Sequence, residues 1–124
     1  MEMNDHRTAA LSMPIEKARL SYKRCFSSEE FKNLLEGFTP RDMDDKWFIF
    51  FENDHLYFHR SWTGVRVYDL TLAKDNGAYI VEEAWVNRDK RQYNWLNDEE
   101  DCVTLDYLIN TFLLNNRMVK SFDR

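Results

Sequence analysis

The chain has 124 residues, the length of one domain, and 44% of them are hydrophobic and 15% aromatic, which excludes a disordered or low-complexity chain. Seventeen Lys and Arg against 22 Asp and Glu give a net charge of −5. This balance is the opposite of the basic footprint of nucleic-acid-binding proteins, so we expect no direct nucleic acid partner. We expect a single domain over residues 1–124, with residues 1–14 as a flexible lead.

The segment 15–26 fits both a helical stripe and strand-like alternation, and we favour a strand. A helix at residues 28–36 is better defined. Ser27 and Glu30 have the spacing of a capping box, in which each side chain accepts a hydrogen bond from the other residue's backbone amide. Gly37 favours the end of this helix, and Pro40 prevents its continuation.

Four strands follow, because the apolar residues change from helical to alternating spacing. The pair Asn76 and Gly77 is the strongest hairpin signal, since both residues accept a positive φ at little cost. The short links between strands predict an antiparallel meander. The expected strands cover residues 47–51, 55–60, 65–72 and 78–86.

A second helix is expected to start at Asn97 or Asp98 and to end at Asn115 and Asn116. Its buried stripe would comprise Leu105, Leu108, Ile109, Phe112 and Leu113. The sequence therefore predicts an α+β fold: a four-stranded antiparallel meander packed against an N-terminal and a C-terminal helix.

No catalytic residue, metal ligand or cofactor site is indicated by a local motif. His55 and His59 have the spacing of helical zinc ligands, but they lie on an expected strand, where that spacing places them roughly 13 Å apart. Cys25 and Cys102 belong to no metal-binding or disulfide pattern. Since the sequence shows neither a signal peptide nor a membrane span, we expect a cytoplasmic protein with reduced thiols.

The densest polar cluster is at residues 59–64, and it has two interpretations. Arg60 could clamp a phosphate or a carboxylate, assisted by the hydroxyls of Ser61 and Thr63. The same residues could instead form a hairpin turn, in which Trp62 covers the edge of the core.

The last expected helix begins with acidic residues, which complement its dipole. Five acids between residues 98 and 106 have no basic neighbour, so we expect them to attract a basic partner. Tyr93 and Trp95 lie in a polar loop, as interface anchors do. The candidate partner-binding residues are Tyr93, Trp95, Asp98, Glu99 and Asp101, together with Asp44 and Asp45 if the fold brings them close.

Four segments resemble a small bacterial domain family that occurs alone or beside ADP-ribosylglycohydrolase-like enzymes. They read GFTPR at 37–41, MDDKWFIFFE at 43–52, LYFHRSWTG at 56–64 and EAWVNRD at 83–89. The resemblance covers residues 28–114 and carries over no catalytic residue. The acidic metal-binding motifs of the glycohydrolases themselves are absent from this sequence.

This resemblance implies a role in conflict over ADP-ribosylation. Together with the acidic charge it suggests a bacterial immunity protein that binds a cognate toxin, for example an ADP-ribosyltransferase, and occludes the active site. An acidic protein would be steered towards a toxin that is basic around its substrate groove. The alternative is an ADP-ribose- or nucleotide-binding module, or an accessory module of ADP-ribosyl hydrolysis, that uses Arg60, Ser61 and Thr63.

Overall fold

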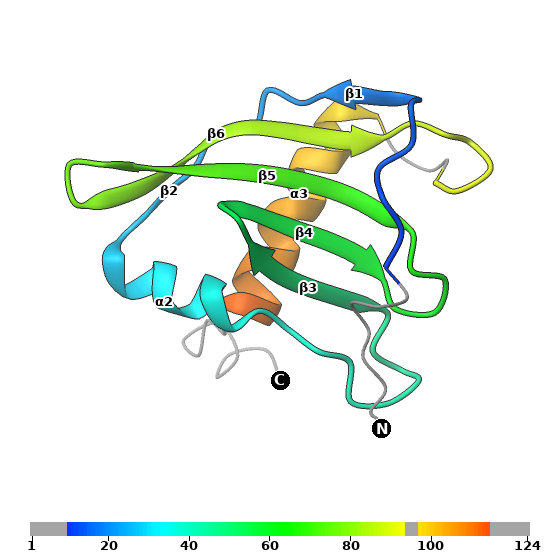
Figure 1. The fold of residues 1–124 in the computed structure, drawn as a ribbon, viewed down its shortest axis with the longest axis horizontal. Coiled ribbons are helices and arrows are strands. Elements are labelled where there is room, and N and C mark those ends of the chain that lie inside the picture. Colours follow the sequence, from blue (N-terminus) through cyan, green and yellow to red (C-terminus); the bar gives the residue numbers. More distant parts are fainter. Residues whose placement is uncertain (1–9, 94–96, 115–124) are drawn as a thin grey trace.

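The computed structural model describes residues 10–93 and 97–114, which form an antiparallel sheet of six strands with one helix across a face and another along the end (Figure 1). The strand order is β1-β6-β5-β4-β3, and β2 also pairs with β6. The elements are β1 (Lys17–Arg19), β2 (Cys25–Phe26), α2 (Ser28–Glu36), β3 (Trp47–Glu52), β4 (His55–Arg60), β5 (Arg66–Asp75), β6 (Ala78–Asn87), α3 (Asp98–Leu108) and the π-helical turn η1 (Ile109–Leu113).

The expected four-stranded sheet is wrong, because two further strands lie along β6. Strands β3 to β6 form the meander, and β1 and β2 then pair with the two ends of β6, opposite residues 85–87 and 79–80. Without these partners the ten-residue β6 would present an open edge of unpaired amides and carbonyls. The fold is therefore dominated by its sheet more than the sequence suggested.

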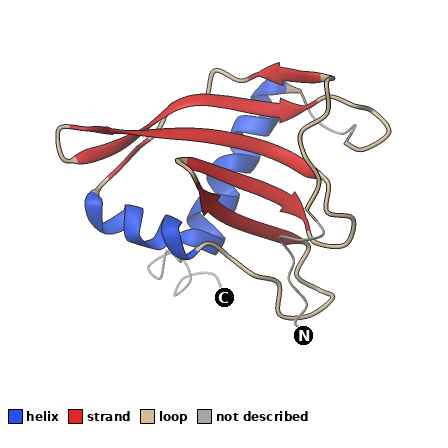
Figure 2. Cartoon of the chain, in the orientation of Figure 1, coloured by secondary structure: helices blue, strands red, loops and turns tan. Residues whose placement is uncertain are grey.

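Both helices begin with capping boxes. In α2 the Ser27 side chain accepts from the Glu30 amide and Glu30 accepts from the Ser27 amide, and Asn97 and Glu100 do the same in α3. Figure 2 shows α3 lying across one face of the sheet and α2 along the end of it. Neither helix within residues 10–93 and 97–114 is long and apolar enough for a membrane span.

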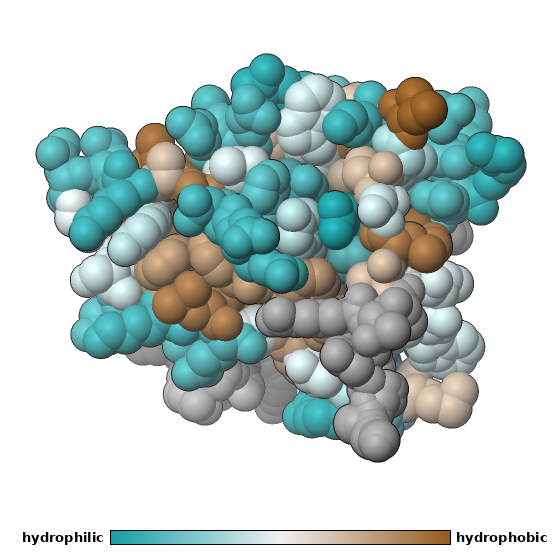
Figure 3. Space-filling model, in the orientation of Figure 1, coloured by the Kyte–Doolittle hydropathy of each residue, from teal (hydrophilic) through white to brown (hydrophobic). Residues whose placement is uncertain are grey.

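The main core lies between the sheet and the helices. Its fully buried side chains include Phe26, Leu34, Tyr68, Leu105 and Ile109, which come from strands and helices alike. Strand β3 is buried on both faces, as its apolar sequence predicted, since Phe48 and Phe50 on one face are only 6% exposed and Ile49 on the other is 0% exposed. This second apolar layer extends to β4, where the His59 ring stacks on Phe50. In Figure 3 hydrophobic residues lie in the middle of the face opposite α3, between hydrophilic ones.

Candidate functional site

The turn between β4 and β5 carries the sequence RSWTG at one end of the sheet. Gly64 has a φ of 78°, and its amide donates to the Arg60 carbonyl at 2.8 Å. The Val65 amide donates to the Thr63 hydroxyl at 3.2 Å. A β-bulge between Phe58 and His59 lies just before this turn, at the kind of position where bulges redirect side chains.

The buried His59 side chain holds this turn in place by a hydrogen bond. Its Nδ1 lies 2.9 Å from the Gly64 carbonyl, which can only accept, so Nδ1 carries the proton. Nε2 then accepts from Arg66 Nε at 3.3 Å. Burial lowers the pKa of His59 to about 4, which keeps the ring neutral near pH 7. The turn therefore rests on a neutral, fully buried imidazole.

Trp62 projects from the turn and is 63% exposed, so the expectation that it covers the core edge is wrong. Its indole N–H donates to the Met43 carbonyl at 3.1 Å, and the Ser61 hydroxyl donates to the Asp45 carbonyl at 2.7 Å. These two bonds attach the turn to the loop before β3. The exposed indole is thus held in one position.

Two cations at this end of the sheet each lie over a tryptophan ring. Lys46 Nζ is 5.4 Å from the centre of the Trp62 ring, and the Arg60 guanidinium is 5.1 Å from the centre of the Trp47 ring. Neither cation forms an ion pair with a carboxylate among residues 10–93 and 97–114. Most other arginines of that part of the chain do have an acidic partner.

These side chains surround a hollow of about 340 Å³, here called the cationic hollow. The β4–β5 turn and the loop after β6, which supply most of its lining, both lie at the right of Figure 1. Its volume falls within the usual range for small-molecule sites. The lining residues are Lys46, Arg60, Trp62, Thr63, Gln92 and Tyr93.

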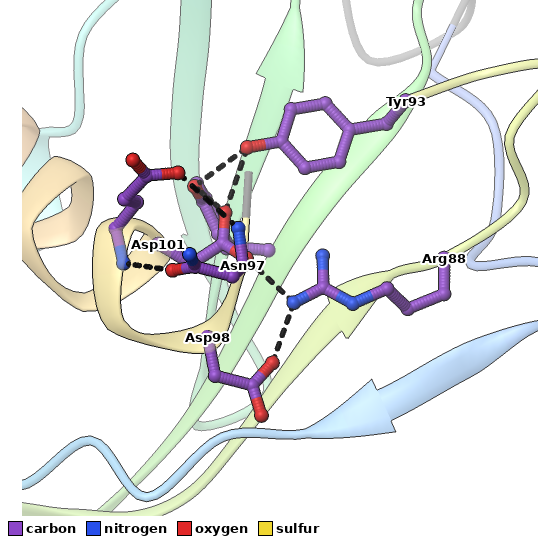
Figure 4. A network of polar contacts seen from close by, with 7 residues as sticks. Arg88, Tyr93, Asn97, Asp98 and Asp101 are labelled. Carbon is purple, nitrogen blue, oxygen red and sulfur yellow. Dashed lines mark hydrogen bonds and ion pairs between the residues drawn. The ribbon is translucent and has the colours of Figure 1, made fainter. Parts of the chain in front are cut away.

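A buried polar network holds the Tyr93 wall in place (Figure 4). The hydroxyls of Tyr68 and Tyr93 both donate to Asp101 Oδ1 at 2.7 Å, and Arg88 donates to Asp101 Oδ2, also at 2.7 Å. Burial, with the nearby Asp101 carboxylate, raises the pKa of both tyrosines above the usual range. Both phenols therefore remain donors, and they link the hollow to the start of α3.

The loop after β6 supplies Gln92 as well as Tyr93 to the lining of the hollow. Gln92 Oε1 accepts from Asn87 Nδ2 at 2.8 Å, and the amides of Gln92 and Tyr93 both donate to the Asp89 carbonyl. Asn87 also donates to the Arg66 carbonyl on β5. The loop is therefore joined to the sheet by hydrogen bonds at its base.

The structure buries two of the residues that were expected to bind a partner. Tyr93 is 5% exposed and Asp101 is 0% exposed, so the expectation that both are surface contacts is wrong. Their hydrogen-bonding groups serve the network. Asp98 is exposed but paired with Arg88 at 2.6 Å, and Glu99 is exposed. Trp95 lies outside the described residues.

Asp44 and Asp45 do not extend the acidic start of α3. Their loop precedes β3 at the lower right of Figure 1, whereas α3 begins at the top, beside β1 and β6. The Asp45 carboxylate accepts from the backbone and side chain of Arg41, and the hydrogen bond from the guanidinium lowers its pKa. Asp44 is exposed and donates its amide to Asp42.

Arg60, Ser61 and Thr63 do not converge on one point. Arg60 and Thr63 line the cationic hollow, whereas Ser61 lines a second hollow that also has Trp62 in its lining. The hydroxyls of Ser61 and Thr63 both make hydrogen bonds that shape the turn. Each interpretation of residues 59–64 therefore agrees with part of the structure: the residues form a turn, and Arg60 lines a hollow.

Sequence reasoning missed Lys46, Trp62 and Gln92 as lining residues. Lys46 and Trp62 both fall within segments of the family resemblance, but nothing in their spacing places them beside Gln92. Their convergence depends on how the ends of β3, β4 and β6 align in the sheet.

In the part of the chain that the structure describes, no group of three or more His, Cys, Asp or Glu side chains is arranged to hold a metal ion. Comparison with known proteins shows no family for this chain, since no protein-family model, no curated protein and no solved structure matches it.

Proposed function

We propose that this protein binds a small phosphorylated ligand with an aromatic ring, such as a nucleotide, in the cationic hollow. The observation that carries the proposal is the convergence of Lys46 and Arg60, two cations without a carboxylate partner among the described residues, in a protein of net charge −5. An unpaired cation beside an aromatic ring is a natural partner for phosphate.

The aromatic part of the ligand would bind at Trp62. The exposed indole can stack on a flat ring, and such stacking contributes about 1–3 kcal/mol in nucleic-acid complexes. Because the indole N–H is already bonded to Met43, the ring does not need to be ordered when the ligand arrives. Thr63 and Gln92 add polar groups that can recognise the edge of the ring or a hydroxyl.

Replacing Arg60 with alanine should weaken ADP binding about 10- to 100-fold, as expected for the loss of a hydrogen bond to a charged group worth about 1.5–3 kcal/mol. Isothermal titration calorimetry with ADP measures this. The matched control is Arg19→Ala, because the Arg19 guanidinium also lies over a tryptophan ring, Trp85 at 5.8 Å, but on the opposite edge of the sheet. This control should bind ADP like the wild type.

Two results would count against the proposal. The first is a wild-type protein that takes up no ADP at millimolar concentration in low salt. The second is an equal loss of affinity in the Arg60 and Arg19 variants, since that would reflect the overall charge of the protein and not the hollow.

A second candidate function is the immunity protein suggested by the family resemblance, and the outer face of α3 favours it. Val103 and Tyr107 are 69% and 59% exposed, one helical turn apart, and Glu99 and Asp106 are exposed on the same helix. An exposed tyrosine amid acids suits a basic protein partner. The partner proposed is a cognate toxin with a basic substrate groove.

Co-expression with the product of the neighbouring reading frame tests this second function. Tyr107→Ala should reduce protection of the cells and weaken the complex about tenfold or more, the effect of removing an interface anchor. Leu35→Ala, an exposed apolar residue on α2, is the control and should protect fully. A neighbouring product that is harmless alone, or a complex that Tyr107→Ala leaves intact, would contradict it.

A further inference from the structure

The side-chain amide of Gln92 can offer only one of its two ends to a ligand in the cationic hollow, and a chain of hydrogen bonds decides which end. The chain starts at Asn87, which is fully buried. The Asp89 backbone amide, which can only donate, lies 2.8 Å from Asn87 Oδ1. Asn87 Nδ2 lies 2.9 Å from the Arg66 carbonyl, which can only accept. Both ends of the Asn87 amide are therefore assigned by their backbone partners.

The orientation of Asn87 determines the orientation of Gln92. The second hydrogen of Asn87 Nδ2 is donated at 2.8 Å to Gln92, so the atom that accepts it must be the oxygen Oε1. Gln92 Nε2 is then the end that has no hydrogen-bond partner among residues 10–93 and 97–114. Since Gln92 is exposed and lines the cationic hollow, it offers N–H donors to a ligand there and keeps its acceptor for the loop.

The other polar side chains of the hollow also leave mainly donors for a ligand. Lys46 and Arg60 carry donors only. The Thr63 oxygen accepts the Val65 amide at 3.2 Å, and its hydroxyl hydrogen is left to donate. The Tyr93 hydroxyl is already used in the buried network. Because no carboxylate is among the lining residues in the described part of the chain, a ligand that fits this hollow is rich in acceptors.

This donor pattern distinguishes between the two kinds of purine base. Guanine and hypoxanthine present two acceptors side by side, the carbonyl oxygen at position 6 and the nitrogen N7, whereas adenine presents a donating amine at position 6 beside N7. For a ring stacked on Trp62, Gln92 Nε2 and the Thr63 hydroxyl supply two donors to the edge of the base. A carbonyl at position 6 satisfies such a donor, and an amine in its place opposes it.

We infer that the cationic hollow prefers nucleotides with a 6-oxopurine base, and that Gln92 is the residue that selects them by donating from Nε2 to the oxygen at position 6. This inference rests on the proposed nucleotide-binding function and specifies the base. ADP still binds through its phosphates and its stacked ring, which it shares with inosine diphosphate (IDP). It lacks only the contact at position 6.

Isothermal titration calorimetry with IDP and ADP tests this inference, since the two nucleotides differ only around position 6. The wild type should bind IDP about tenfold more tightly than ADP, because a hydrogen bond replaces two opposed donors. Gln92→Glu keeps the acceptor for Asn87 and offers the hollow an acceptor in place of a donor. Both ligands should bind this variant less tightly because of charge repulsion, and the preference should reverse in favour of ADP.

Lys90→Gln is the matched control. It makes the same change of net charge in the same loop, at an exposed residue that does not line the hollow. This variant should keep the tenfold preference for IDP. A control that loses the preference would overturn the inference, because overall charge and not the Gln92 amide would then determine it.

The remaining outcomes separate this inference from the proposed function. Equal wild-type affinities for IDP and ADP would overturn the inference alone, as would a preference for IDP that survives Gln92→Glu. An equal loss for both ligands in Gln92→Glu, with their ratio unchanged, would show that Gln92 faces the phosphates and not the base. Failure of the wild type to bind either nucleotide would instead reject the proposed function, and the inference with it.

Discussion

Replacing Asp101 with alanine should lower the free energy of unfolding by about 3–5 kcal/mol, the usual cost of removing one partner of a buried ion pair. The variant would leave Arg88 and the hydroxyls of Tyr68 and Tyr93 without their shared acceptor. Asp101 is fully buried, so water cannot replace the lost carboxylate without opening the contact between α3 and the sheet. Urea denaturation at pH 7 measures the change.

Asp98→Ala is the matched control for this effect. Asp98 pairs with the same Arg88 nitrogen in the same helical turn, but its side chain is 65% exposed. Exposed ion pairs contribute about 0–1 kcal/mol, so the control should lose no more than that. Similar losses for Asp98→Ala and Asp101→Ala would show that the buried network does not anchor α3.

Replacing Gly37 with alanine should destabilise the protein by about 3 kcal/mol. Gly37 ends α2 with φ 65° and ψ −161°, a region that residues with a side chain occupy only at a cost of about 1–3 kcal/mol. A Cβ there would also lie 2.4 Å from the Ile49 carbonyl of β3. That carbonyl accepts the Phe38 amide, so neither backbone can move without losing this bond. Thermal or urea unfolding measures the loss.

Gly77→Ala provides the comparison for this variant. Gly77 also has a positive φ, of 83°, but a Cβ at this hairpin turn would meet nothing within 4 Å. This variant should therefore lose only about 1–2 kcal/mol in its free energy of unfolding, the cost of the left-handed backbone conformation for a residue with a side chain. If the two alanine variants were equally stable, close packing of α2 on β3 would not be the reason for Gly37.

Local signals predicted the elements that depend on a few neighbouring residues. The capping box of Ser27 and Glu30, the end of α2 at Gly37 and the turn at Asn76 and Gly77 all form as expected. Each of them satisfies backbone groups within a single turn, so no distant contact decides them.

The number of strands could not be predicted in the same way. Strand β1 has three residues and β2 has two, too few for an alternating pattern to separate a strand from a helix. What determines them is the free edge of β6, which lies more than fifty residues further along the chain.

The site was harder to predict because charge in a sequence does not report burial. Asp101 was expected to be exposed with the other acids of its run, but it is buried. Arg88 and the hydroxyls of Tyr68 and Tyr93 stabilise the buried carboxylate, and none of these residues is a close neighbour in the sequence. Trp62 showed the opposite error, since a large aromatic residue was expected to cover the core and is exposed. In both cases a partner brought in by the fold decides the outcome.

The most direct test of the central claim is a nuclear magnetic resonance titration of the labelled protein with ADP, observed at the tryptophan indole N–H groups. The Trp62 signal, assigned with a Trp62→Phe variant, should shift and saturate as the nucleotide is added. The Trp85 signal should stay in place, because its ring lies under Lys17 and Arg19 at the far edge of the sheet. A Trp62 signal that stays fixed while ADP is added, or one that moves no more than Trp85, would contradict a nucleotide site in the cationic hollow.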